Sequence, residues 1–170
     1  LPSTRVWVHD DREGLGAAPT TLFGDAALGV GKIGQGLVFG GTGYAAVADG
    51  GRAYVAGSFS VEAWVKTSAA ADMTIVSDYE CGQTCIGGVA NSVFQMRLTN
   101  TGNAQFYVRD TAGAVQTVTG TATLSDGEFH HVVGVRDLAA GKLRIYVDGG
   151  EDVAADLIVT GALKDDDAED

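Results

Sequence analysis

Residues 59–65 of the chain, FSVEAWV, decide its fold, because Phe59, Val61, Ala63 and Val65 stand at every second position. A period of two is typical of a β-strand that buries one face and exposes the other. The same alternation, rich in Val, Ile, Phe and Tyr, recurs in residues 94–98, 106–109, 129–135 and 143–147. The sequence therefore predicts short strands in each of these places.

Turn-forming residues separate the predicted strands. They are Asp49-Gly50-Gly51, the run NTGN at residues 100–103, Asp126-Gly127 and Asp148-Gly149. Gly, Asn and Asp tolerate the positive φ values that tight hairpin turns require. No window carries a long stripe with the 3.6-residue period of a helix. Many short strands at turn-marked intervals predict an all-β sandwich or barrel.

The length and composition fit one domain. The 170 residues are 45% hydrophobic and include 25 glycines without a collagen-like period, which suits a fold with many tight turns. No apolar run is long enough for a membrane span, and residues 1–20 lack the layout of a signal peptide. The expected organisation is a domain over residues 1–163 followed by an acidic tail over residues 164–170.

The net charge of −11 is concentrated at the C-terminal end. Residues 148–170 hold nine acidic side chains and a single basic one, Lys164. Without a basic patch to displace counterions, nucleic acid is not an expected partner. Anionic membranes are disfavoured for the same reason, and we expect no membrane insertion. The acidic end is expected to be a solvated tail, with a Ca²⁺ or partner contact as the alternative.

The two cysteines, Cys81 and Cys85, lie in the loop sequence CGQTC. Their spacing is not that of the redox motif Cys-x-x-Cys, and two thiolates are too few for a structural zinc site. We predict a local disulfide, which implies an oxidising compartment; two free thiols are the alternative.

Four motifs in order resemble one protein family. Residues 31–41 (GKIGQGLVFGG) with Tyr44 and Val47 resemble its opening strand pair, and residues 58–66 its central strand. Residues 126–133 (DGEFHHVV) resemble its DG-x-W/F-H-H-V hairpin, and residues 143–149 (LRIYVDG) its L-x-L/I-Y-V-D-G strand. The chain is thus similar to bacterial laminin-G-like modules. The resemblance implies a concanavalin A-like jelly-roll sandwich of two antiparallel sheets.

The resemblance also carries expectations about context. Such modules are typically appended to secreted or cell-surface enzymes, adhesins and other multidomain proteins, where many bind carbohydrate and some bind protein. This sequence departs from the family where an Asp often stands, at Gly40 and Gly43. It also lacks the family's closing strand, similar to G-x-I-D-E-V-R-I-Y, after Asp148-Gly149. Either the sequence stops short of that strand or the sheet edge closes in another way, and an uncovered edge would favour aggregation.

Catalysis is not expected. Related jelly-roll glucanases carry a Glu-x-Asp-x-Glu strand whose alternation places acid and nucleophile on one face. Glu62 is the single acid of the central strand here, and no Gly-x-Ser-x-Gly elbow occurs. His130 and His131 are adjacent and should point to opposite faces of a strand. The parity shared with Phe129 and Val133 predicts His131 in the core and His130 toward solvent or ligand.

Binding residues are expected on the polar parity of the strands and on nearby loops. If residues 94, 96, 98, 106 and 108 face the core, then Arg97, Tyr107 and Arg109 project the other way. Aromatic faces and forked polar donors suit sugars. An ordinary solvated sheet face is the alternative. The long loop that contains the cysteines adds Tyr79 and Asn91, and the next turn adds Asn100.

A structural Ca²⁺ is a further expectation. Asp10, Asp11 and Asp25 are candidate oxygen donors, although no EF-hand spacing is present. The leading functional hypothesis is a non-catalytic, lectin-like module that binds a glycan. The alternative is a protein-binding, adhesion or structural module.

Overall fold

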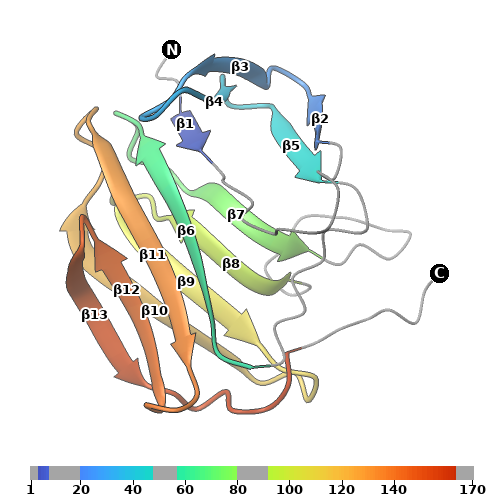
Figure 1. The fold of residues 1–170 in the computed structure, drawn as a ribbon, viewed down its shortest axis with the longest axis vertical. Helices are drawn as coiled ribbons and strands as arrows, with labels where there is room; N and C mark the ends of the chain where they lie inside the picture. The colour runs from blue at the N-terminus through green and yellow to red at the C-terminus, as the bar shows by residue number, and fades with distance from the viewer. Residues whose placement is uncertain (1–3, 8–19, 48–56, 80–91, 164–170) are drawn as a thin grey trace.

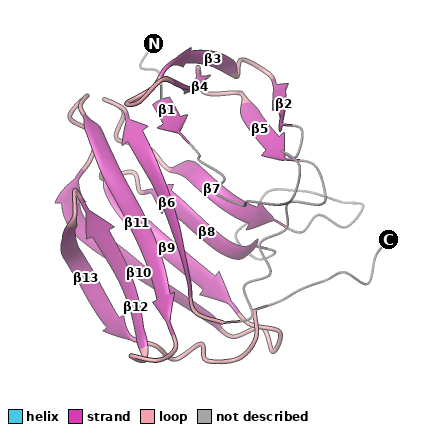
Figure 2. Ribbon diagram, viewed as in Figure 1, coloured by secondary structure: helices cyan, strands magenta, loops and turns pink. Residues whose placement is uncertain are grey.

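A computed structural model of the chain describes residues 4–7, 20–47, 57–79 and 92–163 (Figure 1). These residues form antiparallel strands joined by turns and loops, without a helix among them (Figure 2). It follows that no helix in this part of the chain could cross a membrane.

Two sheets face each other. The larger one has seven strands in the order β13 (Gly150–Asp156), β12 (Lys142–Val147), β11 (Phe129–Asp137), β6 (Phe59–Lys66), β1 (Thr4–Trp7), β4 (Gln35–Phe39) and β3 (Ala27–Val30). The smaller one has four strands in the order β10 (Val115–Thr123), β9 (Asn103–Arg109), β8 (Ser92–Leu98) and β7 (Met73–Tyr79). A separate pair consists of β2 (Thr20–Phe23) and β5 (Tyr44–Val47). Figure 1 shows β13, β12, β11 and β6 in front of β10, β9 and β8, so the protein is the predicted antiparallel sandwich.

The core lies between the sheets and consists of alternate residues of the facing strands. Those most deeply buried are Val65, Val132, Leu143 and Ile145 of the large sheet, and Met96, Leu98, Phe106 and Val108 of the small sheet. Phe59 of β6 bridges the two layers, with its ring centroid 5.4 Å from that of Phe94 and 6.0 Å from that of Phe106. A Cβ at Gly134 would lie 2.6 Å from the Phe106 ring, so the glycine makes room for this aromatic contact.

The five strands predicted from alternation are confirmed, but the predicted facing of the strand over residues 129–135 is wrong. Val132, Gly134 and Arg136 are the buried residues of β11, so the even-numbered positions face the core. His131 lies on the outer face, where its ring contacts Trp64. His130, the second residue of β11, has the same parity as the buried residues of the strand. The prediction failed because hydropathy favours Phe129 and Val133 as the inward residues. The residues that face inward instead include Arg136, which is polar in sequence but buried in the structure.

The opening strands also differ from the expected pair. β4 pairs with β1 and β3, whereas β5 pairs with β2. Gly40 to Gly43 connect β4 to β5, and Gly41 has a φ of 117°, which L side chains rarely adopt. The chain therefore leaves the large sheet at this point.

A polar clamp holds the end of β11 to the β12–β13 hairpin. Asp148 and Gly149 both have positive φ, as a two-residue turn of the favoured twist requires. The Asp148 carboxylate accepts hydrogen bonds from the backbone N–H of His131 and from Nδ1 of His130, each 2.8 Å long. His130 Nε2 lies 3.1 Å from Asp126 Oδ1. Burial opposes protonation of His130, but its contacts with Asp148 and Asp126 outweigh this and raise its pKa.

The segment after β13 closes the sandwich without forming a strand. Leu157, Val159 and Leu163 are buried in the core. Gln116 of β10 grips this segment, since its Nε2 donates to the Asp156 carbonyl and its Oε1 accepts from the N–H of Ile158, both at 2.8 Å. This segment therefore covers part of the core between the sheets, while β13 remains the end strand of the described seven-stranded sheet.

Arg136 is the central anchor of this closure. Its fully buried guanidinium donates from Nη1 to the Gly57 carbonyl at 2.9 Å and from Nη2 to the carbonyls of Val159, at 3.0 Å, and Gly161. Burial lowers its pKa, and the charge of Asp110 partly offsets that effect. One side chain of β11 therefore ties the start of β6 to the C-terminal segment.

Replacing Arg136 by Met should strongly destabilise the protein. Met keeps much of the aliphatic volume but leaves three carbonyls, that of Val159 among them in a buried contact, without their donor, and the expected loss of unfolding free energy is about 3 kcal/mol. Urea denaturation measures this. The control is Arg144→Met, which removes a solvent-accessible arginine and should cost far less; equal losses in the two variants would contradict the anchoring role.

The His130 clamp should make stability depend on pH. A raised pKa means that protonated His130 stabilises the fold below its unfolded value of about 6.5, and that the benefit disappears as pH rises through the folded pKa. The pKa values of Asp126 and Asp148 are lowered, so their contribution is lost only as pH falls below about 4. The melting temperature of the wild type should exceed that of His130→Gln most at about pH 5–6 and least above pH 8. The same difference at both ends would refute the clamp.

Candidate functional site

The outer face of the four-stranded sheet carries a row of polar side chains that spans all its strands. Thr74 of β7, Arg97 of β8, Gln105 of β9 and Thr119 of β10 are successive partners in the register. Arg97 Nε donates to Gln105 Oε1 at 2.6 Å, and Gln105 Nε2 donates to Thr119 Oγ1 at 2.8 Å. We call this row, together with its neighbours Gln95 and Tyr107, the polar ladder.

Gln95 and Tyr107 form a second rung beside the first. They are partners in the register, and Thr117 of β10 lies opposite Tyr107. Gln95 Nε2 donates to Thr74 Oγ1 at 3.1 Å, which links the two rungs. Within the described part of the chain, Gln95 Oε1 is buried without a hydrogen-bond partner. An unpaired buried acceptor is costly, and because this oxygen is buried it is not within reach of a ligand in this conformation.

The predicted alternation of β8 and β9 is confirmed, because Phe94, Met96, Leu98, Phe106 and Val108 are all buried in the core. Tyr107 is not part of the hydrophobic core, as the alternation predicts, but it is only 8% exposed and so offers little surface to a ligand. Burial raises the pKa of its phenol, while the charge of Arg109 acts in the opposite direction. Tyr107 therefore stays protonated near neutral pH, and Arg97 and Arg109 are the more accessible members of the predicted trio.

Two of the loop-side candidates, Tyr79 and Asn100, lie near the two ends of β8. Tyr79 ends β7 opposite Ser92, the first residue of β8, whereas Asn100 is exposed in the turn after β8. They therefore mark opposite ends of a seven-residue strand, about 20 Å apart. The side chain of Tyr79 is outside the described set, as are Asn91, Cys81 and Cys85, and the disulfide stays a prediction.

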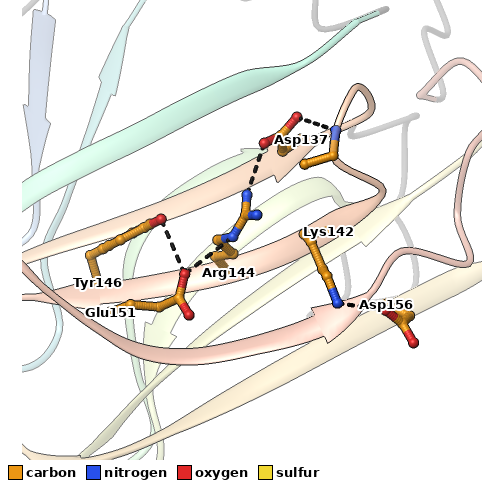
Figure 3. Close-up of polar contacts among 7 residues, drawn as sticks. Asp137, Lys142, Arg144, Tyr146, Glu151 and Asp156 are labelled. Atoms are coloured by element: carbon orange, nitrogen blue, oxygen red, sulfur yellow. Dashed lines mark hydrogen bonds and ion pairs between the residues drawn. The ribbon is translucent and has the colours of Figure 1, made fainter.

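The arginine on the opposite sheet has a different environment. Arg144 of β12 lies between Asp137, at 2.8 Å from its Nη1, and Glu151, at 3.2 Å from its Nε (Figure 3). Tyr146 donates its hydroxyl to the same Glu151 at 3.3 Å. Two carboxylates thus neutralise Arg144, whereas Arg97 is held by a neutral amide and keeps its positive charge available.

Asp25 accepts hydrogen bonds from the loop between β4 and β5. Its Oδ1 accepts from the Gly40 N–H at 3.1 Å, and its Oδ2 accepts from the N–H and the hydroxyl of Thr42 at 3.1 and 2.9 Å. The hydrogen bond from the Thr42 hydroxyl is the main cause of its lowered pKa. A Cβ at Gly43 would lie 2.5 Å from Asp25 Oδ1, so the glycines at positions 40 and 43 make room for this carboxylate.

Calcium therefore gains no support from Asp25, because a cation would face hydrogen-bond donors that already point at both oxygens. Within the described ranges, no three His, Cys, Asp or Glu side chains converge so as to hold a metal ion. Asp10 and Asp11 lie outside those ranges.

Sequence reasoning missed the threonines that complete the ladder. The strand VQTVTGTAT over residues 115–123 alternates Thr with small or apolar residues, and this pattern was the available signal. The contribution of Thr74 had no local signal, because it depends on which strands are neighbours.

Comparison with known proteins agrees with the fold. A family model described as the concanavalin A-like lectin/glucanases superfamily matches residues 39–168. No curated protein matches the sequence.

Solved structures with a similar fold include domains LG4-5 of the mouse laminin alpha1 chain, with 21% identity over 67% of this chain and 27% of that one, at a TM-score of 0.50. The botulinum neurotoxin serotype G binding domain has 13% identity over 87% of this chain and 37% of its own, at a TM-score of 0.58. The binding domain of Paraclostridial Mosquitocidal Protein 1 has 11% identity over 95% and 41%, at a TM-score of 0.54. The chain thus spans less than half the length of these structures, and at such identities the similarity concerns the fold.

Removing the Asp25 carboxylate should destabilise the protein equally with and without calcium. Asp25→Ala deletes the acceptor of three hydrogen bonds from the β4–β5 loop. Melting temperatures of wild type and variant, each in CaCl₂ and in EDTA, provide the measurement. A wild-type stabilisation by calcium that the variant loses would instead identify Asp25 as a metal ligand.

Proposed function

The chain belongs to the laminin-G-like family of the concanavalin A-like lectin/glucanase superfamily, and from this premise we propose that it is a non-catalytic module that binds a glycan through the polar ladder. The observation that carries the proposal is the state of Arg97. Its guanidinium is oriented by the Gln105 amide oxygen, yet among the described residues no carboxylate neutralises it. An oriented, charged, partly exposed fork is suited to hydroxyl pairs or to a carboxylate.

The neighbouring groups of the ladder suit a hydroxyl-rich ligand. Thr74, Thr117 and Thr119 are exposed and offer hydroxyls that both donate and accept. Hydrogen bonds within the ladder fix several of these side chains before a ligand arrives. Such preorganisation lowers the entropy cost of binding.

Binding is also favoured over catalysis by the residues present and by the similar structures. Two of the solved structures are named as binding domains of bacterial toxins. The central strand β6 carries Glu62 as its single acid, which is insufficient for the paired-carboxylate chemistry of glycoside hydrolysis. We further propose an extracellular or cell-surface location within a larger polypeptide, as is general for this family.

Protein binding is the second candidate, and it is favoured by the edge strand β3. Leu28 and Val30 of β3, with Ile33 in the adjoining turn, are 63%, 71% and 65% exposed. β3 is the last strand of the described seven-stranded sheet, and exposed apolar side chains at this place can pack against a partner protein.

A glycan array, probed with and without CaCl₂, should identify a ligand whose affinity depends on Arg97. Loss of a hydrogen-bonding anchor costs about 1–3 kcal/mol, so Arg97→Ala should weaken the best array ligand roughly five- to 150-fold in calorimetric titration. Tyr107→Phe tests the second rung without deleting the buried ring.

The matched control is Arg144→Ala, which removes an arginine of the opposite sheet that two carboxylates already neutralise. It should leave the affinity unchanged. If Arg97→Ala binds like the wild type while its melting temperature is unaltered, the ladder is not the glycan site and the β3 edge becomes the stronger candidate.

A further inference from the structure

A cluster of lysine and aromatic side chains lies on the outer face of the seven-stranded sheet, on the opposite side of the sandwich from the polar ladder. In the pairing of β6 with β11, Trp64 lies opposite His131 and Lys66 lies opposite Phe129. The Trp64 and His131 ring centroids are 5.0 Å apart. The side chain of Lys32, from the turn between β3 and β4, lies over the rings of Trp64 and Phe129. We call these five residues the lysine–aromatic cluster.

The two ammonium groups converge on the aromatic rings. Lys32 Nζ is 5.1 Å from the Trp64 ring centroid and 6.0 Å from that of Phe129, and Lys66 Nζ is 5.4 Å from the Phe129 centroid. Contacts of this kind hold a cation near a ring without neutralising its charge. Lys32 is exposed and Lys66 is partly exposed, so both charges are within reach of a ligand.

The absence of acidic partners for these lysines is unusual in so acidic a chain. The sequence has a net charge of −11, and Lys142 and Arg144 of β12 both pair with carboxylates. In the part of the chain that the structure describes, Lys32 and Lys66 have no carboxylate within ion-pair distance. Positive charge and aromatic residues therefore gather on one small area of a negative protein.

We propose that the lysine–aromatic cluster is a second binding site, specific for an acidic saccharide. The ligand's anionic group would lie between Lys32 and Lys66, and the apolar C–H face of its ring would pack on Trp64 or Phe129. This site is independent of the polar ladder, with which it shares no residue and no sheet.

Glu62 sets the selectivity of the cluster. Its carboxylate lies 3.2 Å from His131 Nε2 and is 65% exposed at one side of the site. An anionic ligand is repelled by this charge, so the cluster should favour ligands with one acidic group at a defined position over densely charged polymers. Removal of the Glu62 charge should tighten the binding of any anion.

The test uses trigalacturonate and its full methyl ester, which retains the sugar rings but has lost the charges. Trp64 reports binding, because Trp7 is the only other tryptophan and Trp7→Phe leaves Trp64 as the sole indole. We expect trigalacturonate to change the Trp64 emission at pH 7 and the ester to do so much more weakly. The affinity should fall as NaCl is raised, since exposed charges are screened. Dextran sulfate against dextran shows whether sulfate can replace carboxylate.

Variants of the cluster should act in opposite directions. Lys32→Ala and Lys66→Ala should each weaken trigalacturonate roughly three- to tenfold, the range of an exposed to partly desolvated ion contact. Glu62→Gln should strengthen it by about twofold or more. Lys142→Ala is the matched control, because that lysine is already paired with Asp156 at 2.7 Å, and should have no effect.

Three results would overturn the proposal. They are equal binding of the ester and the acid, equal losses in Lys142→Ala and Lys32→Ala, and a loss of trigalacturonate binding in Arg97→Ala alone. The last result would assign the acidic sugar to the polar ladder. Conversely, failure of the ladder as a glycan site leaves the predictions for Lys32 and Lys66 unchanged.

Discussion

The buried guanidinium of Arg136 is the interaction on which the closure of the sandwich depends. A charged group without a carboxylate contact is costly in a core, and here it is compensated by carbonyls of Gly57, Val159 and Gly161. Those carbonyls belong to segments about a hundred residues apart in sequence. The arginine therefore ties two irregular stretches of backbone to the core.

With the core closed, strand alternation presents two outer faces of different chemistry. The four-stranded sheet displays amides, hydroxyls and Arg97, which bond mainly to one another. The seven-stranded sheet displays the aromatic rings of β6 and β11, with Lys32 and Lys66 close to them. On β12 and β13 it displays charged side chains that are paired with one another. Because the faces belong to separate layers, substitutions on one should not disturb the other, and a single domain can offer two ligands separate surfaces.

Much of the fold was predictable because local patterns agree with it. The alternation in β6, β8, β9 and β12, and the Asp148-Gly149 turn, follow from side-chain periodicity and positive φ alone. The facing of β11 was not, since Arg136 is polar in sequence but buried in structure, and only its distant carbonyl partners explain that. The complete ladder was also unpredictable, because Thr74 and Thr119 meet Arg97 and Gln105 only through the order of strands in the sheet. The burial of Tyr107 likewise has no signal in the local sequence.

The grip of Arg136 and Gln116 on residues 156–161 has a mechanical consequence. A tensile load applied to the backbone at Leu163 would reach the contacts of Thr111 and Asp110 with residues 162 and 163 first. It would then pass to Gly161 and Val159 at Arg136, and only afterwards to β13. Force would thus be resisted first by backbone contacts and then by the side-chain hydrogen bonds of Arg136, which open one after another while the β12–β13 ladder and both outer faces remain intact. In a tethered protein, the C-terminal segment would detach before either outer face is deformed.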